Sequence, residues 1–266
     1  MNIILNLFPG GVSRALTMSY DDGQVHDLRL AKLFDANGIK GTFHLNSSNI
    51  NKPGFLAEEN LRGELKNHEI SVHTKTHPFL TKIPDSIIIS ECMEDKAFLE
   101  QAIQIPIRGM SYPYGQYTNH VIDILRACGM EYSRTVNATN NFEIPDDFME
   151  WHPTTHHNGN LDTLWEQFIN RNPDKMLLFY LWGHSYEFHN QDNWEAIEHF
   201  CEMASGHEDI WYATNVQIYN YVSAVRSLIF SADCTMIQNP TATDVWLTIN
   251  LKPVCIKAGS TYTATT

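Results

Sequence analysis

The feature that most constrains the fold is a repeated alternation of short apolar runs with amphipathic stretches of helical spacing. In the first repeat, we predict a strand over 15–20, a helix over 27–37 and a second strand over 39–45. Gly38 follows the helix at the position where a helix-terminating glycine is expected. A strand, a helix and a strand in about 30 residues make the crossover unit of a parallel sheet.

The alternation continues over most of the chain. The further predicted strands are 68–73, 107–112, 131–136, 176–181 and 210–214, and the further predicted helices are 57–67, 84–103, 119–128, 161–170, 193–205 and 216–226. The run 176–181 is apolar throughout, which is typical of a parallel strand buried on both faces. About seven strands predict an α/β fold, a distorted parallel (β/α) barrel, as a catalytic domain over 1–226.

The pattern changes after residue 226. Four short strands are predicted over 227–230, 235–238, 244–250 and 254–257, with turn-forming residues between them and no helical stretch. We therefore expect a small β-rich C-terminal appendage over 227–266.

Charge and targeting patterns narrow the partners. Lys and Arg total 18 and Asp and Glu 31, a net charge of −13, which argues against nucleic-acid binding. No run approaches the roughly 20 apolar residues of a membrane span. The short apolar run at the start of the sequence lacks the basic residues of a secretory signal peptide and ends at Pro9. The five cysteines are scattered and form no C-x-x-C pair, which favours a reducing compartment. We expect a cytoplasmic protein with no membrane partner; a secreted protein whose leader has been trimmed is the alternative, and the oligomeric state stays open.

Chemistry in a β/α barrel sits at the carboxyl ends of the strands. The residues predicted at those ends are Asp21, Asp22, His44, His73, Tyr114, Arg134, His184 and Asn215. Two acids, several histidines and an arginine on one rim suggest a metal site. For His44, a core histidine is the more ordinary interpretation.

Two motifs supply candidate metal ligands. Asp21 and Asp22 are consecutive, so one carboxylate can bind a cation while the other faces a substrate; an Asp-Gly turn is the alternative. His73 and His77 have a spacing that puts both imidazoles on one face if the chain turns helically, although Pro78 requires that turn to be short. Two histidines and a carboxylate leave positions for water and substrate, which suits a hydrolytic Zn²⁺, Co²⁺ or Fe²⁺ site.

Two further motifs follow strand ends. The turn 112–115 (YPYG) can aim a backbone N–H group at the site. His184 ends the most apolar strand, where partial burial suits proton transfer near neutral pH; a hydrogen-bonded core histidine is the alternative.

The stretches SYDDG (19–23), HTKTH (73–77), YPYG (112–115) and LWGH (181–184) occur in this order. They resemble four of the five signature motifs of the polysaccharide deacetylases (NodB homology, carbohydrate esterase family 4). The resemblance spans roughly residues 12–225 and leaves the C-terminal segment outside. It implies that Asp22, His73 and His77 bind a divalent metal, zinc before cobalt or iron, and that Asp21 is the general base.

The resemblance also implies roles on the substrate side. The backbone N–H of Tyr114 would stabilise the oxyanion formed from the acetamide, and His184 would protonate the departing amine. Leu181 would line the pocket for the acetyl methyl group.

The chain departs from the family pattern at two motifs. Where the third motif usually has an arginine, this chain has Ser111, and Arg108 lies three residues upstream. We expect Arg134, at the end of the next strand, to orient Asp21 instead.

The fourth motif has no clean match, and its region holds WHPTTHH (151–157). Trp151 can stack on a sugar ring with His156 or His157 nearby, or the stretch is a surface loop. Trp182 and Tyr186 flank His184 and can shape a sugar subsite, although core packing is the alternative for Trp182.

We therefore expect a metal-dependent hydrolase that removes N-acetyl groups from N-acetylated amino sugars or oligosaccharides. One alternative is a hydrolase of a small non-sugar amide with the same site. The other is a catalytically inactive carbohydrate-binding protein.

Overall fold

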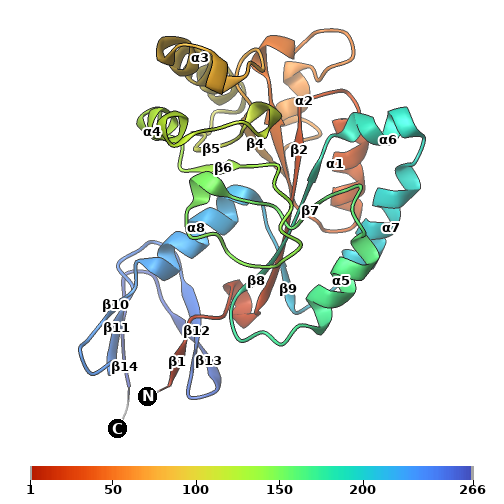
Figure 1. Ribbon diagram of the computed structural model, residues 1–266. Helices are drawn as coiled ribbons and strands as arrows, with labels where there is room; N and C mark the ends of the chain where they lie inside the picture. Colours follow the sequence, from red (N-terminus) through yellow and green to blue (C-terminus); the bar gives the residue numbers. More distant parts are fainter. Residues whose placement is uncertain (1, 265–266) are drawn as a thin grey trace.

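A curled sheet of eight parallel strands forms the centre of the molecule, and the computed structural model describes residues 2–264 (Figure 1). The strands pair in the order β6-β5-β4-β3-β2-β8-β7, and β9 pairs with the first half of β2. Their bounds are β2 Arg14–Asp21, β3 Gly41–Leu45, β4 Glu69–Val72, β5 Gly109–Ser111, β6 Tyr132–Arg134, β7 Thr155–His156, β8 Leu177–Gly183 and β9 Ile210–Tyr212. The predicted fold class, a distorted parallel (β/α) barrel, is confirmed.

Helices follow most of the strands and cover the outside of the sheet (Figure 1). Their bounds are α1 Asp27–Ala36, α2 Glu58–Arg62, α3 Asp85–Ile103, α4 Asn119–Ala127, α5 Leu161–Asn170, α6 Ser185–Gln191, α7 Trp194–Ala204 and α8 Asn215–Arg226. The two central strands, β2 and β8, are buried almost throughout because both of their faces are covered. Because all strands of the sheet are parallel, their carboxyl ends lie at the same rim.

Three elements of the barrel differ from the sequence-based expectation. The helix predicted over 57–67 ends at Arg62, because Gly63 follows and glycine costs about 1 kcal/mol in a helix. Helix α6, directly after His184, was not predicted, and neither was β7. β7 is two residues long and pairs with β8 through Thr155 and His156, so local periodicity carries no signal for it.

The C-terminal appendage contains two small antiparallel sheets. One has the order β1-β12-β13 and the other β10-β11-β14. Their bounds are β1 Ile3–Ile4, β10 Ile229–Phe230, β11 Met236–Gln238, β12 Val245–Ile249, β13 Lys252–Ile256 and β14 Thr261–Thr263. Because Ile3 pairs with Ile249, the N-terminus belongs to the appendage, which the boundary at 226 did not foresee.

The appendage is packed onto the barrel through α8. Its buried residues Ile237, Val245 and Leu247 share one apolar cluster with Ile218 and Tyr221 of α8. Figure 1 shows α8 lying between the barrel and the appendage, with the N-terminus beside the latter. The rim that carries the predicted site lies elsewhere, so the appendage does not form part of it.

No helix among residues 2–264 combines the length and apolar character that a membrane crossing requires. The five cysteines are free thiols, and Cys92, Cys128 and Cys201 are buried, as expected of small apolar side chains.

Candidate active site

A cavity of about 650 Å³ lies at the carboxyl ends of the central strands. The residues that line it are Asp21, Asp22, His73, His77, Tyr112, Tyr114, Val136, Trp182, His184 and Tyr186. They come from the ends of β2, β4, β5, β6 and β8 or from the loops that follow these strands. The structure thus brings together most of the residues predicted at the rim.

The two consecutive acids face different partners because the backbone conformation changes from extended at Asp21 to left-handed at Asp22. Asp21 is the last residue of β2, and Asp22 has a φ of 79°, in the left-handed region. The N–H of Asp22 donates to the carbonyl oxygen of His44 at 3.0 Å, which fixes this turn. Asp21 is 3% exposed, whereas the Asp22 side chain is 21% exposed. One carboxylate is therefore buried and the other faces the cavity.

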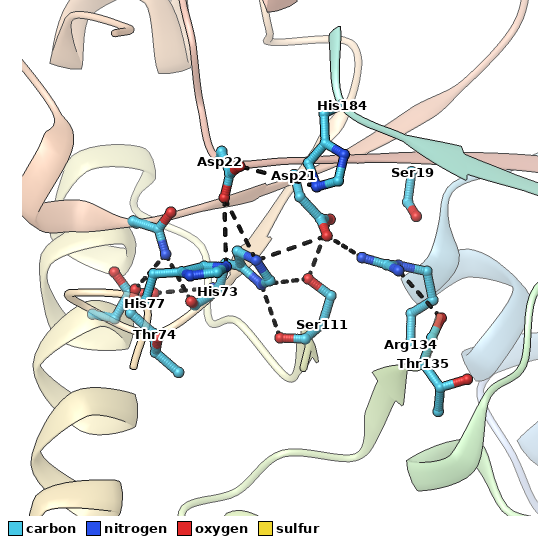
Figure 2. A network of polar contacts seen from close by, with 12 residues as sticks. Ser19, Asp21, Asp22, His73, Thr74, His77, Ser111, Arg134, Thr135 and His184 are labelled. Carbon is cyan, nitrogen blue, oxygen red and sulfur yellow. Dashed lines mark hydrogen bonds and ion pairs between the residues drawn. The ribbon is translucent and has the colours of Figure 1, made fainter. Parts of the chain in front are cut away.

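Asp22, His73 and His77 form a trio with the spacing of metal ligands (Figure 2). Asp22 Oδ1 lies 3.7 Å from Nε2 of His73 and 3.7 Å from Nε2 of His77. Two ligand atoms each about 2.1 Å from one cation can lie at most about 4.2 Å apart, so both separations fit a shared ion. Burial lowers the pKa of His73 to about 3, which keeps its imidazole in the neutral form that binds metals.

His73 is held in place from both sides. Its Nδ1 lies 2.9 Å from the carbonyl oxygen of Ser111 and 2.6 Å from Ser111 Oγ, which leaves Nε2 toward Asp22. The buried carboxylate of Asp95 accepts the N–H groups of His73 and Ser47, at 3.1 and 2.6 Å. These contacts fix the ring and the backbone of the loop that carries both histidines.

Asp21 is surrounded by positive and polar groups. Arg134, fully buried at the end of β6, forms an ion pair with Asp21 Oδ2, and Ser111 Oγ donates to Oδ1 at 3.2 Å (Figure 2). Burial by itself raises the pKa of Asp21, but the Arg134 guanidinium, followed by His73, outweighs burial and holds the pKa well below its usual range. Asp21 is therefore a carboxylate at neutral pH, 3.7 Å from Nε2 of His73.

The predicted partnership of Arg134 with Asp21 is thus present in the structure. Arg134 also stacks on Trp182, 4.2 Å from the ring centroid, which fixes the guanidinium plane. Arg108 points elsewhere and pairs with Glu131 at 2.6 Å near the surface.

His184 follows β8 and is paired with a carboxylate that the sequence analysis missed. Its Nδ1 lies 2.7 Å from Oε1 of Glu187, and its Nε2 lies 4.0 Å from Oδ2 of Asp22. Burial lowers the pKa of His184, but the Glu187 hydrogen bond and the charges of Asp21 and Asp22 outweigh burial and raise the pKa overall. The imidazolium form is therefore more favoured than in a free histidine side chain, and Nε2 is directed at the cavity.

Tyr114 lines the cavity from the turn after β5. It has a φ of 57°, and its ring contacts His77 at a centroid distance of 4.4 Å. A Cβ on the following residue, Gly115, would lie 2.3 Å from Val136, so only glycine fits here. The turn therefore has a fixed path beside His77, and the role of the Tyr114 N–H stays a prediction.

Two predicted substrate contacts need correction. Trp151 is completely buried and packs against Phe148 and Tyr180, with centroid distances of 4.8 Å, so it has no free face for a sugar. Leu181 is also fully buried and belongs to the core outside the barrel. Side chains alternate along β8, so Trp182, the next residue, is the one that lines the cavity.

Two other rim candidates lie outside the cavity. His44 is completely buried beside Asp21 in the sheet, and burial lowers its pKa to about 3, in agreement with a core histidine. Asn215 hydrogen bonds to Thr17 at 2.8 Å and to Tyr180 at 2.5 Å, inside the barrel. Its side chain supports the packing of α8 against the sheet.

Sequence reasoning missed the contributions of Ser111 and Glu187. Ser111 was noted only as the residue that replaces an arginine, although its place at a strand end was a signal. Glu187 lies three residues after His184, a spacing that brings side chains together on a helix. Because α6 was not predicted, the spacing of three residues did not identify Glu187 as a partner of His184.

Comparison with known proteins gives a family match. Residues 11–133 match the family model described as polysaccharide deacetylase. A curated relative, chitin deacetylase 1 of Cryptococcus neoformans var. grubii, is 28% identical over 142 residues, which cover 51% of this chain. The matched stretch spans only 28% of the length of that relative.

Solved structures share the fold. A protein of Mycobacterium smegmatis described as a polysaccharide deacetylase matches with a TM-score of 0.63 and 16% identity, covering 85% of this chain and 96% of that one. A family 4 carbohydrate esterase of Streptomyces lividans, solved with acetate, matches with a TM-score of 0.52 and 12% identity, covering 76% of this chain and 93% of that one.

Proposed function

Because residues 11–133 of this chain belong to the polysaccharide deacetylase family, we propose that the protein is a metal-dependent N-deacetylase. Its substrates are N-acetylated amino sugars or their oligosaccharides. The observation that carries the proposal is the grouping, in one cavity, of a metal-ligand trio, a buried carboxylate held by Arg134 and a histidine paired with a carboxylate. Metal-assisted amide hydrolysis uses these three parts: a cation, a base and an acid.

The residues Asp22, His73 and His77 would hold the divalent cation, with zinc the best match to two imidazoles and one carboxylate and cobalt or iron as alternatives. When bound, such a cation supplies Lewis acidity, which makes water more acidic and stabilises negative charge on an acyl oxygen. Asp21, ionised and fixed by Arg134, accepts the proton of the attacking water. Its burial keeps bulk water from competing for that proton.

The leaving amine needs a proton because it departs poorly as an anion. His184 presents Nε2 to the cavity while Glu187 holds Nδ1, so the two nitrogens have separate tasks. Asp21 and His184 thus approach the cavity from different strands, β2 and the end of β8, and act on opposite sides of the amide.

The walls of the cavity fit a sugar better than a fully apolar ligand. Trp182, Tyr114 and Tyr186 offer aromatic surface, and the histidines and acids supply hydrogen-bonding groups. The acetate bound to the Streptomyces lividans esterase supports an acetyl group as the unit removed.

The hydrogen bond from Glu187 to His184 gives a prediction. In Glu187→Gln protein, we expect kcat to fall roughly ten- to a hundredfold, because a hydrogen bond to a charged group contributes about 1.5–3 kcal/mol. Glu187 raises the pKa of His184. Its loss lowers that pKa, so the decline of kcat at high pH should begin at lower pH. Glu198→Gln, which removes an exposed partner of Arg29, should leave the pH profile unchanged.

The test of the proposed function is release of acetate from N-acetylglucosamine and from its oligomers by zinc-loaded protein. Release from one or more of these sugars supports the proposal, and the dependence of kcat/KM on chain length ranks them. Metal-loaded protein that releases no acetate from sugars but hydrolyses small acetanilides would favour the non-sugar amide alternative. Binding of oligomers without hydrolysis of either class would favour the inactive carbohydrate-binding alternative.

A further inference from the structure

A second group of potential ligands lies beside His184, and its two histidines have no part in the proposed reaction. It consists of His156 of β7, the adjacent His157 and Glu187 of α6. Oε2 of Glu187 lies 3.0 Å from Nε2 of His157 and 3.6 Å from Nε2 of His156. Among residues 2–264, this trio and the trio of Asp22 are the two groups with ligand atoms close enough to share an ion.

We propose that His156, His157 and Glu187 form a second binding site for a divalent transition metal such as Zn²⁺ or Co²⁺. Ligand atoms about 2.1 Å from one ion lie at most about 4.2 Å apart. The two separations that involve Glu187 are within this limit, and the ligand atoms of all three residues lie within 4.8 Å of one another. The donor set of two imidazoles and one carboxylate suits zinc or cobalt rather than calcium or magnesium. The side chains of His156 and Glu187 are 24% and 20% exposed, so an ion can enter from solvent and keep a water ligand.

The three groups have the protonation states that metal binding requires. Burial and the neighbouring His157 lower the pKa of His156 to about 4, and burial also lowers the pKa of His157. Burial raises the pKa of Glu187, but its hydrogen bonds to His157 and His184 outweigh burial and hold the pKa well below its usual range. At neutral pH the trio is two neutral imidazoles and one carboxylate.

Binding of an ion requires a tautomer change at His157, which has a free-energy cost that the ion must offset. To bind an ion, Nε2 must give up the proton that it shares with Glu187, and the neutral ring then carries its proton on Nδ1. Within the described part of the chain, Nδ1 is buried and has no hydrogen-bond partner. The change therefore breaks the hydrogen bond between Nε2 and Glu187 and leaves a buried N–H group without an acceptor, which is unfavourable. The bonds of the ion to His156, His157 and Glu187 must exceed this cost. Asn158 also donates to Oε2 of Glu187 at 3.0 Å, so it must share that oxygen with the ion.

The surrounding chain fixes the His157 ring. Tyr20 stacks on it at a centroid distance of 5.8 Å, and Phe188 packs against it at 4.2 Å. A Cβ at Gly183 would lie 1.9 Å from His157 Nδ1, so this position admits the ring only because it is glycine. A ring held in this way loses little freedom when it binds an ion.

Glu187 connects the two parts of the cavity. Its Oε1 holds His184 and its Oε2 faces His156 and His157, so an ion on the second trio shares a carboxylate with the histidine of the proposed reaction. The site itself does not depend on that reaction, because metal binding can be measured without a substrate.

The experiment counts cobalt ions bound to metal-stripped full-length protein after dialysis against a small excess of Co²⁺, measured by mass spectrometry of the metal. Wild type should bind about two ions and His156→Gln about one. His77→Gln, which removes a ligand of the other trio, should also bind about one. His199→Gln, which removes an exposed imidazole paired with Asp162, is the matched control and should bind as many ions as wild type.

The proposal is overturned if His156→Gln binds as much cobalt as wild type, or if wild type binds a single ion that only His77→Gln loses. Loss of an ion in His156→Gln with no loss in His77→Gln would support this site and contradict the metal trio of the proposed function. Thermal unfolding by circular dichroism checks that each variant is folded. If His156→Gln fails that check, Glu187→Gln, which also removes one ligand, should bind one ion fewer than wild type.

Discussion

Replacing Asp21 by Asn should lower kcat for amide hydrolysis by roughly 10²–10⁴-fold, the usual contribution of a positioned general base. Asparagine has nearly the same shape as aspartate, but its amide cannot accept the proton from water at neutral pH. The Asp22, His73 and His77 side chains remain, so the affinity for the first metal ion should stay within a few fold. Single-turnover kinetics and metal titration of the same preparation check both halves of this expectation.

The matched control is Asp95→Asn. Asp95 is also a buried carboxylate near His73, but it accepts backbone N–H groups and does not line the cavity. This substitution should reduce stability and leave most of the turnover. Equal losses of kcat in the two variants would show that Asp21 contributes to turnover by stabilising the structure and not by accepting a proton.

Replacing Arg134 by Met should be the most destabilising single change at this site. Both partners of the Arg134–Asp21 ion pair are buried, and removal of one partner leaves an uncompensated charge, at a cost of about 3–5 kcal/mol. The pKa of Asp21 should rise, because burial is no longer opposed by the guanidinium. Urea unfolding measures the loss of stability, and kcat should fall because part of the Asp21 population becomes protonated.

Arg108→Met tests the same chemistry without burial. Arg108 and Glu131 pair at 2.6 Å with side chains 36% and 37% exposed, and such pairs contribute about 0–1 kcal/mol. If Arg134→Met is no more destabilising than Arg108→Met, the pair with Asp21 does not support the site in the way described here. If kcat of Arg134→Met is unchanged, the positioning role of Arg134 is wrong.

The order of the elements was predictable because each one has its own periodicity. Asp21, His73 and Arg134 were placed at one rim on that basis, since parallel strands end on the same side. The assignment of Leu181 failed by one residue. That assignment came from the family resemblance. Side chains alternate along a strand, so Leu181 faces the core outside the barrel and the next residue, Trp182, lines the cavity.

Other parts of the structure depend on long-range contacts that no local pattern records. Trp151 is buried because its segment pairs with Arg134, and β1 exists because Ile3 meets Ile249 at the other end of the chain. Glu187 reaches His184 only because α6 forms directly after β8. These features could be recognised only in the tertiary fold. The acids and histidines of the four motifs could be recognised in the sequence itself.

The most direct test of the proposed function is the metal dependence of acetate release from N-acetylglucosamine oligomers. Protein stripped of metal should release no acetate, and a small excess of Zn²⁺ over both proposed sites should restore release in wild type but not in His77→Gln. Release by stripped wild-type protein at the zinc-loaded rate, or full recovery in His77→Gln, would contradict a catalytic metal held by Asp22, His73 and His77.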